Sequence, residues 1–293
     1  MSLRDAESLN WEVNGLGLAG LSWGCQGERP VLALHGWLDN AASFSALGPL
    51  LTGCQLVALD LSGHGRSDHR SPDASYQIWD DLPEILGVLN ELGWEQFDLV
   101  GHSRGAIIAG LLAATFPERV KRLVLLDAVS PEPVPEQDFA RQMRRALTEK
   151  QESPQRKPKI FATLEEAAAR REAGGLSHAA ALALAARNVS QCKGGGVTWT
   201  TDSRLQCASA VKLTGAQIRA VLGALTMPVM LLLAKDVAAD SRVRMAGHAR
   251  QTIRDIRVAE VVGGHHFHLE QGAGDVAQLM LQFLTDRTGR ENI

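Results

Sequence analysis

Aromatic residues and cysteines are scarce in this 293-residue chain, which contains six Trp, seven Phe, one Tyr and four Cys. Cys25, Cys54, Cys192 and Cys207 form no CxxC pair and show no metal-ligand spacing. We therefore expect reduced thiols in a cytoplasmic protein rather than a disulfide framework, although four scattered cysteines could also pair in an exported protein.

Long apolar runs and a large charge of one sign are also missing. The longest charge-free apolar helical stretch, residues 106–116, has about half of the roughly 20 residues that a membrane-spanning helix needs. Residues 1–7 lack the basic start and apolar run of a signal peptide. The formal net charge is −3, with 30 basic and 33 acidic side chains. The sequence therefore predicts neither a membrane nor a nucleic acid as partner.

What remains is ordinary for a globular protein, with 45% hydrophobic and 22% charged residues. Short apolar runs that end at or near a Gly or Asp predict buried strands, and residues 78–92 and 106–116 have helical spacing. Repeated alternation of this kind predicts an α/β fold with a doubly wound, parallel sheet. The start of the chain differs, because residues 9–13 and 18–23 predict an antiparallel hairpin around Asn14-Gly15. The short apolar runs that predict the buried strands lie at residues 31–34, 56–59, 97–100, 123–126 and 228–233.

One segment interrupts the alternation. From residue 131 to about residue 224 there is no convincing strand, but helical patches occur at residues 137–150, 164–172 and 178–188. We therefore divide the chain into a core of residues 1–130 and 226–293 and an inserted helical cap of residues 131–225. The cap has an excess of basic side chains, which a solvated helix face explains better than an anion-attracting patch.

The motif that carries chemistry is Gly101-His102-Ser103-Arg104-Gly105. It fits the pattern G-x-S-x-G and stands between a predicted strand and a predicted helix, as a nucleophile elbow requires. At such a strained turn the glycines avoid clashes with neighbouring backbone, and the serine hydroxyl is exposed near the positive end of the helix. We interpret Ser103 as a nucleophile rather than as part of an ordinary glycine-rich turn.

A serine nucleophile needs a general base, and the base needs an orienting carboxylate. The order along the chain in this architecture is Ser, acid, His, so the base should follow the last predicted strand, residues 258–262. Three histidines lie there. We prefer His265, with His266 as the rival and His268 in a packing role. They could instead bind a metal, but no Cys, Asp or Glu outside them stands at ligand spacing, so we expect no metal site.

Two backbone N–H groups should stabilise the oxyanion that forms during acyl transfer. One belongs to Arg104, directly after the nucleophile, and the other to Trp37, in the loop after the strand at residues 31–34. Trp37 and Leu38 are also expected to line the substrate pocket. Phe139 and Met143 of the cap are further candidates for substrate contacts, although packing explains them about as well.

Four motifs in register resemble the α/β-hydrolase superfamily: His35-Gly36-Trp37, Asp60-Leu-Ser-Gly-His-Gly-Arg-Ser67, Gly101-His-Ser-Arg-Gly105 and Gly264-His-His-Phe-His-Leu-Glu270. Residues 196–205 resemble the serine-hydrolase-like branch of that superfamily. The resemblance implies a mostly parallel, eight-stranded sheet with helices on both faces and an inserted helical cap. It also implies hydrolysis of carboxylic-ester-type substrates without a cofactor.

The acid that orients the base has two candidates. Asp127 ends the strand at residues 123–126, where the resembling branch keeps an Asp, and we prefer it. A structural role is the other reading of Asp127, in which it holds the hinge of the cap. Asp236 follows the strand at residues 228–233, where relatives place the acid more often, and Asp240 is a distant third.

Together these motifs predict a serine hydrolase, in the first place a carboxylesterase for small to medium apolar esters that works through an acyl-enzyme. Serine at the elbow argues against dehalogenase and epoxide hydrolase chemistry, which needs a carboxylate there. The alternative is a ligand-binding or sensory protein that keeps the same residues with little turnover. A small-molecule substrate is the one partner predicted. The pattern G-x-G-x-x-G at residues 15–20 is not followed by a helix, so nucleotide binding is rejected.

Overall fold

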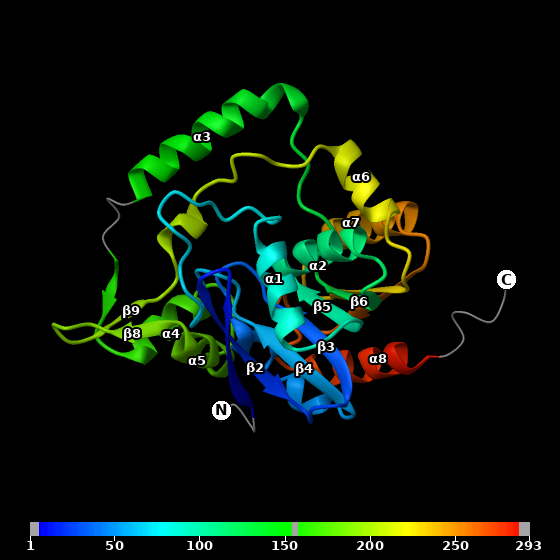
Figure 1. The fold of residues 1–293 in the computed structure, drawn as a ribbon, viewed down its shortest axis with the longest axis horizontal. Coiled ribbons are helices and arrows are strands. Elements are labelled where there is room, and N and C mark those ends of the chain that lie inside the picture. Colours follow the sequence, from blue (N-terminus) through cyan, green and yellow to red (C-terminus); the bar gives the residue numbers. More distant parts are fainter. Residues whose placement is uncertain (1–5, 154–157, 287–293) are drawn as a thin grey trace.

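An eight-stranded sheet forms the centre of the computed structural model, which describes residues 6–153 and 158–286 (Figure 1). The strand order is β1-β2-β4-β3-β5-β6-β10-β11. The pairs β1–β2 and β2–β4 are antiparallel and the others are parallel, so the predicted mostly parallel sheet is confirmed. The strands are β1 (Glu7–Val13), β2 (Leu16–Trp23), β3 (Arg29–Leu34), β4 (Cys54–Leu59), β5 (Phe97–His102), β6 (Val120–Leu126), β10 (Val229–Ala234) and β11 (Ile256–Val261).

The central strands are apolar throughout because helices cover both faces of the sheet. In β3, Leu32 and Leu34 belong to one buried cluster, whereas Val31 and Ala33 belong to the other. This is the alternation of a strand, whose successive side chains point to opposite faces. The first cluster includes α1 (Asp81–Glu91), α2 (Arg104–Thr115), α6 (Gly215–Gly223) and α7 (Ala239–Thr252). The second includes α5 (His178–Arg187) and α8 (Ala273–Thr285).

The predicted hairpin at the start of the chain is confirmed. Val13 pairs with Leu16, which leaves a two-residue turn at Asn14 and Gly15. Both residues have positive φ, 53° and 77°, as a turn that matches the twist of its strands requires. The chain continues from Leu16 as a strand rather than a helix, so residues 15–20 present no helix amino terminus to a nucleotide.

The inserted segment contains the predicted helices α3 (Phe139–Glu152), α4 (Leu164–Glu172) and α5. The expectation that it contains no strand is wrong, because β7 (Ile160–Phe161), β8 (Val189–Gln191) and β9 (Val197–Trp199) form a small antiparallel sheet in the order β7-β9-β8. Strands this short give no readable alternation. Short 3₁₀ helices among the described residues are η1 (Ala41–Phe44), η2 (Gly48–Leu50), η3 (Glu136–Asp138) and η5 (Ser203–Gln206).

A buried ion pair fixes the inserted segment to the sheet. Arg187 of α5 donates from Nε to Asp60, 2.9 Å from Oδ2, and both side chains are buried. Asp60 also accepts the backbone N–H groups of Ala41 and Arg66, at 2.7 and 2.9 Å. The loop after β4 and helix α5 are therefore held by one carboxylate.

The division into residues 1–130 with 226–293 and residues 131–225 stays a prediction, because α5 shares an apolar cluster with the central strands. Residues 1–5, 154–157 and 287–293 of these ranges lie outside the described residues. In the part of the chain that the structure describes, no helix has the length and apolar character needed to cross a bilayer.

Candidate active site

Ser103 stands at a sharp turn between β5 and α2, with φ 52° and ψ −117°. Such a backbone conformation is strained for any residue with a Cβ atom. The two glycines of the motif are required here by close packing. A Cβ atom at Gly101 would lie 2.4 Å from the carbonyl oxygen of Gly105, and one at Gly105 would lie 2.1 Å from the carbonyl oxygen of Leu34. The predicted elbow geometry is therefore present around Ser103.

His265 and Asp127 form a hydrogen-bonded pair, with 2.6 Å between Nδ1 and Oδ2. Because a carboxylate only accepts, Nδ1 carries the proton and Nε2 is free to take one. Asp127 follows β6 and is nearly buried, with φ 54°. Its Oδ1 accepts the N–H of Ala234 at 2.9 Å. Asp236 lies exposed in the turn after β10, so the structure brings Asp127 and not Asp236 to His265.

Ser103 and His265 line the same cavity of about 280 Å³, together with Gly36 and Trp37. The hydrogen bonds of the described residues do not include one between Ser103 Oγ and the His265 ring. Such bonds commonly tighten only when substrate is bound. The cavity nevertheless collects side chains from the ends of β5 and β11, which lie apart in the sequence and meet at the carboxyl edge of the sheet.

The two N–H groups predicted for the oxyanion belong to Trp37, in the loop after β3, and to Arg104, the first residue of α2. Neither the N–H of Trp37 nor that of Arg104 has an acceptor among the hydrogen bonds of the described residues. The side chains of Trp37 and Arg104 make hydrogen bonds to other parts of the structure. The indole Nε1 of Trp37 donates to the carbonyl of Leu205 at 2.9 Å, and Nη2 of Arg104 donates to Asp81 at 2.8 Å.

The predicted substrate contacts are divided between cavities. Trp37 lines both the cavity beside Ser103 and a second one of about 450 Å³, whereas Leu38 lines neither and adjoins a third cavity. Phe139 and Met143 lie on α3, Phe139 about half exposed, and neither belongs to the lining of the two cavities at Trp37. For Leu38, Phe139 and Met143 a substrate contact stays a prediction.

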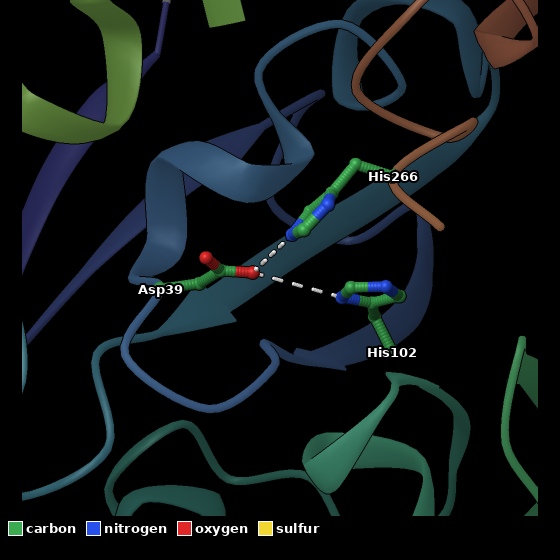
Figure 2. Close-up of side chains that lie close together, drawn as sticks. All are labelled: Asp39, His102 and His266. Carbon is green, nitrogen blue, oxygen red and sulfur yellow. Dashed lines mark hydrogen bonds and ion pairs between the residues drawn. The ribbon is translucent and has the colours of Figure 1, made fainter. Parts of the chain in front are cut away.

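Sequence reasoning missed a cluster of Asp39, His102 and His266 in the cavity wall (Figure 2). One carboxylate oxygen of Asp39 faces both rings, 3.1 Å from Nε2 of His266 and 3.7 Å from Nδ1 of His102. The other oxygen accepts from Arg171, in the last turn of α4. Burial raises the pKa of Asp39, but the hydrogen bond from His266 and the charges of His266 and Arg171 outweigh it, so that the pKa lies well below its usual value.

This cluster could hold a metal ion, because its three ligand atoms lie within 4.8 Å of one another. Asp39, His102 and His266 lie far apart in the sequence, so no local ligand spacing indicates the cluster. The available signals were His102, inside the elbow motif, and Asp39, two residues after the His35-Gly36-Trp37 motif. Both residues come from loops or strand ends at the same sheet edge as Ser103.

Four buried histidines predict a steep loss of stability in acid. Burial lowers the pKa of His35, His64, His102 and His268 below the ordinary value near 6.5. The unfolded chain therefore binds more protons than the folded one below about pH 6.5, so stability is full above that pH and falls as pH drops through it. Each histidine should contribute about 1 kcal/mol per pH unit.

Urea unfolding measured between pH 8 and pH 5 checks this prediction. In His64→Asn the amide can donate to the Ser62 carbonyl that His64 Nδ1 contacts, so the fold should survive with a shallower pH slope. A free energy of unfolding that does not change between pH 7 and pH 5 would contradict the prediction.

Residues 29–272 match the alpha/beta hydrolase fold family. The protein is an α/β-hydrolase. This hydrolase is 33% identical over 279 residues to a serine hydrolase-like protein of Danio rerio. The match covers 91% of this chain and 85% of that protein. A crystal structure of a hypothetical protein from Pseudomonas aeruginosa PAO1 is 38% identical, with a TM-score of 0.90 over 96% of this chain and 100% of that one.

A second solved structure is the thioesterase domain from the curacin biosynthetic pathway. It is 28% identical to this α/β-hydrolase, with a TM-score of 0.84 over 95% of this chain and 100% of that one. The predicted superfamily, its serine-hydrolase-like branch and the fold class are confirmed by these matches. The matches concern family and fold, and the roles of Ser103, His265 and Asp127 stay predictions.

Proposed function

We propose that this α/β-hydrolase cleaves small to medium, largely apolar carboxylic esters through an acyl-enzyme on Ser103. The observation that supports this most strongly is the Asp127–His265 hydrogen bond of 2.6 Å beside a strained serine in the same cavity. A serine hydroxyl alone is a poor nucleophile, and an imidazole fixed in one tautomer is the base that activates it.

In the proposed reaction, Ser103 Oγ attacks the ester carbonyl while His265 Nε2 takes the hydroxyl proton. Asp127 keeps the proton of His265 on Nδ1 and stabilises the imidazolium. The carbonyl oxygen becomes an oxyanion, which the N–H groups of Trp37 and Arg104 stabilise. His265 then gives its proton to the departing alcohol, and water, deprotonated by the same ring, releases the acid and frees Ser103.

The position of Trp37 indicates where the two groups of an ester substrate would bind. The 280 Å³ cavity holds the reacting serine, and Trp37 also lines the 450 Å³ cavity. An ester with one short and one longer group could occupy both. Similarity to a thioesterase domain adds acyl thioesters to the candidate substrates. A cytoplasmic location is part of the proposal.

Two measurements on the wild-type protein separate the hydrolase from a sensory protein. A fluorophosphonate probe should label one serine, and esters of p-nitrophenol and an acyl thioester, in a series of acyl lengths, should be hydrolysed continuously. Labelling without turnover on any member of the series would favour the sensory alternative. Absence of labelling would refute an activated serine.

A further inference from the structure

The Asp39 cluster, composed of Asp39, His102 and His266, gathers two imidazoles and a carboxylate from three separate segments (Figure 2). Asp39 lies in the loop after β3, His102 ends β5 and His266 lies between β11 and α8. These are the ligand types that zinc and similar divalent transition metals prefer. The proposed ester hydrolysis uses none of the three.

His102 presents a lone pair to this cluster without a protein donor. Its Nε2 lies 2.9 Å from the carbonyl oxygen of His265, and since a carbonyl only accepts, Nε2 carries the proton. In the tautomer that this hydrogen bond selects, Nδ1 is the acceptor nitrogen of the ring. The ring is fully buried, and Nδ1 has no hydrogen-bond partner among the described residues.

Two acceptors therefore face each other, because Asp39 Oδ2 stands 3.7 Å from His102 Nδ1. An unsatisfied buried polar atom costs about 1–3 kcal/mol. A cation between the two atoms would satisfy both lone pairs. The Asp39 carboxylate supplies a negative charge that attracts it.

The spacing suits a transition metal. Tetrahedral zinc with bonds of about 2.0–2.1 Å holds its ligand atoms roughly 3.4 Å apart. The two separations from Asp39, 3.1 and 3.7 Å, lie on either side of that value, and all three ligand atoms lie within 4.8 Å of one another. Gly36 keeps the space open, because a Cβ atom there would lie 2.9 Å from His102 Nδ1 and 3.1 Å from Asp39 Oδ2. His266 is partly exposed and can move its proton from Nε2 to Nδ1 when it becomes a ligand.

We propose that the Asp39 cluster binds one divalent transition metal ion of the Zn²⁺ class, and that the bound ion inhibits the serine beside it. Three protein ligands leave a fourth position open to the cavity that Ser103 and His265 line. A divalent charge there opposes formation of the His265 imidazolium. This inhibition rests on the proposed function, whereas the binding itself does not.

Arg171 sets the strength of binding. Its guanidinium holds the second oxygen of Asp39, with another hydrogen bond at 3.2 Å to the carbonyl of Leu38. A fixed positive charge on the same carboxylate weakens the attraction for a cation. Removing this charge should therefore tighten metal binding, which no nonspecific surface site would show.

Calorimetric titration of the full chain with ZnCl₂, and absorption spectra with Co²⁺ as a coloured substitute, test the site. The wild type should bind one ion with a tetrahedral cobalt spectrum. His266→Gln should weaken binding by about tenfold or more, since even outer partners of ligands are worth 10–100-fold. Arg171→Gln should tighten it. The control His178→Gln removes an exposed histidine paired with Glu172 and should change nothing.

Three results would overturn the site: no zinc binding below millimolar concentration, binding unaffected by His266→Gln, or binding lost in Asp127→Asn, which would place the ion on the His265 pair. Zinc binding without any fluorophosphonate labelling would keep the site and refute the proposed hydrolase. Labelling and turnover that saturating zinc leaves unchanged would refute the inhibition alone.

Discussion

Alanine in place of Ser103 is expected to abolish labelling by a fluorophosphonate and to lower kcat for p-nitrophenyl acetate by about 10⁶-fold, as loss of the nucleophile does in serine hydrolases. The reason is geometric. Ser103 is the side chain at the elbow, in the cavity that His265 lines. Alanine keeps the Cβ atom and therefore the same backbone strain at φ 52°, so the fold should be unchanged.

Ser190 provides the matched control for this experiment. It is exposed on β8, away from the cavity beside Ser103, and Ser190→Ala should label and turn over like the wild type. Thermal unfolding of both variants reports whether the fold is kept. Labelling that persists in Ser103→Ala would show that the probe reacts elsewhere and that the elbow serine is not the nucleophile.

The local sequence pattern was sufficient to predict the sheet and the nucleophile elbow. The apolar runs that became β3, β5 and β6 are each buried on both faces, which makes a continuous apolar run the only signal needed. The elbow around Ser103 could be recognised from the five-residue pattern alone, although only the close contact at Gly101 is local, with Gly105 and Ala106, while Gly105 meets the backbone of Leu34 on β3. A single sequence carries both kinds of information.

Long-range contacts were beyond sequence reasoning. Arg187 of α5 reaches Asp60, and Asp39 reaches His266, over separations that no periodicity encodes. The order Ser, acid, His also left two positions for the acid, because β6 and β10 are neighbours in the sheet and both end near His265. Deciding between Asp127 and Asp236 needed the direction of each side chain, which the chain order does not give.

Asparagine in place of Asp127 is therefore expected to lower kcat by about 10⁴-fold, the loss seen when the orienting carboxylate of a serine hydrolase is replaced by an amide. Asp127 has two different neighbours, the N–H of Ala234 at Oδ1 and His265 Nδ1 at Oδ2. Asparagine has one acceptor oxygen. If that oxygen keeps the bond to Ala234, the NH₂ group faces His265 and forces the proton onto Nε2, where it blocks the base.

Asp236→Asn is the control, because Asp236 is exposed in the turn after β10. It should keep full activity under the same assay, and both variants should unfold near the wild-type temperature. Fluorophosphonate labelling of Asp127→Asn should slow in proportion to kcat, since the same proton transfer activates Ser103 for the probe. An inactive Asp236→Asn beside a fully active Asp127→Asn would assign the acid to Asp236 and leave Asp127 as a carboxylate that joins β6 to β10 through the Ala234 N–H.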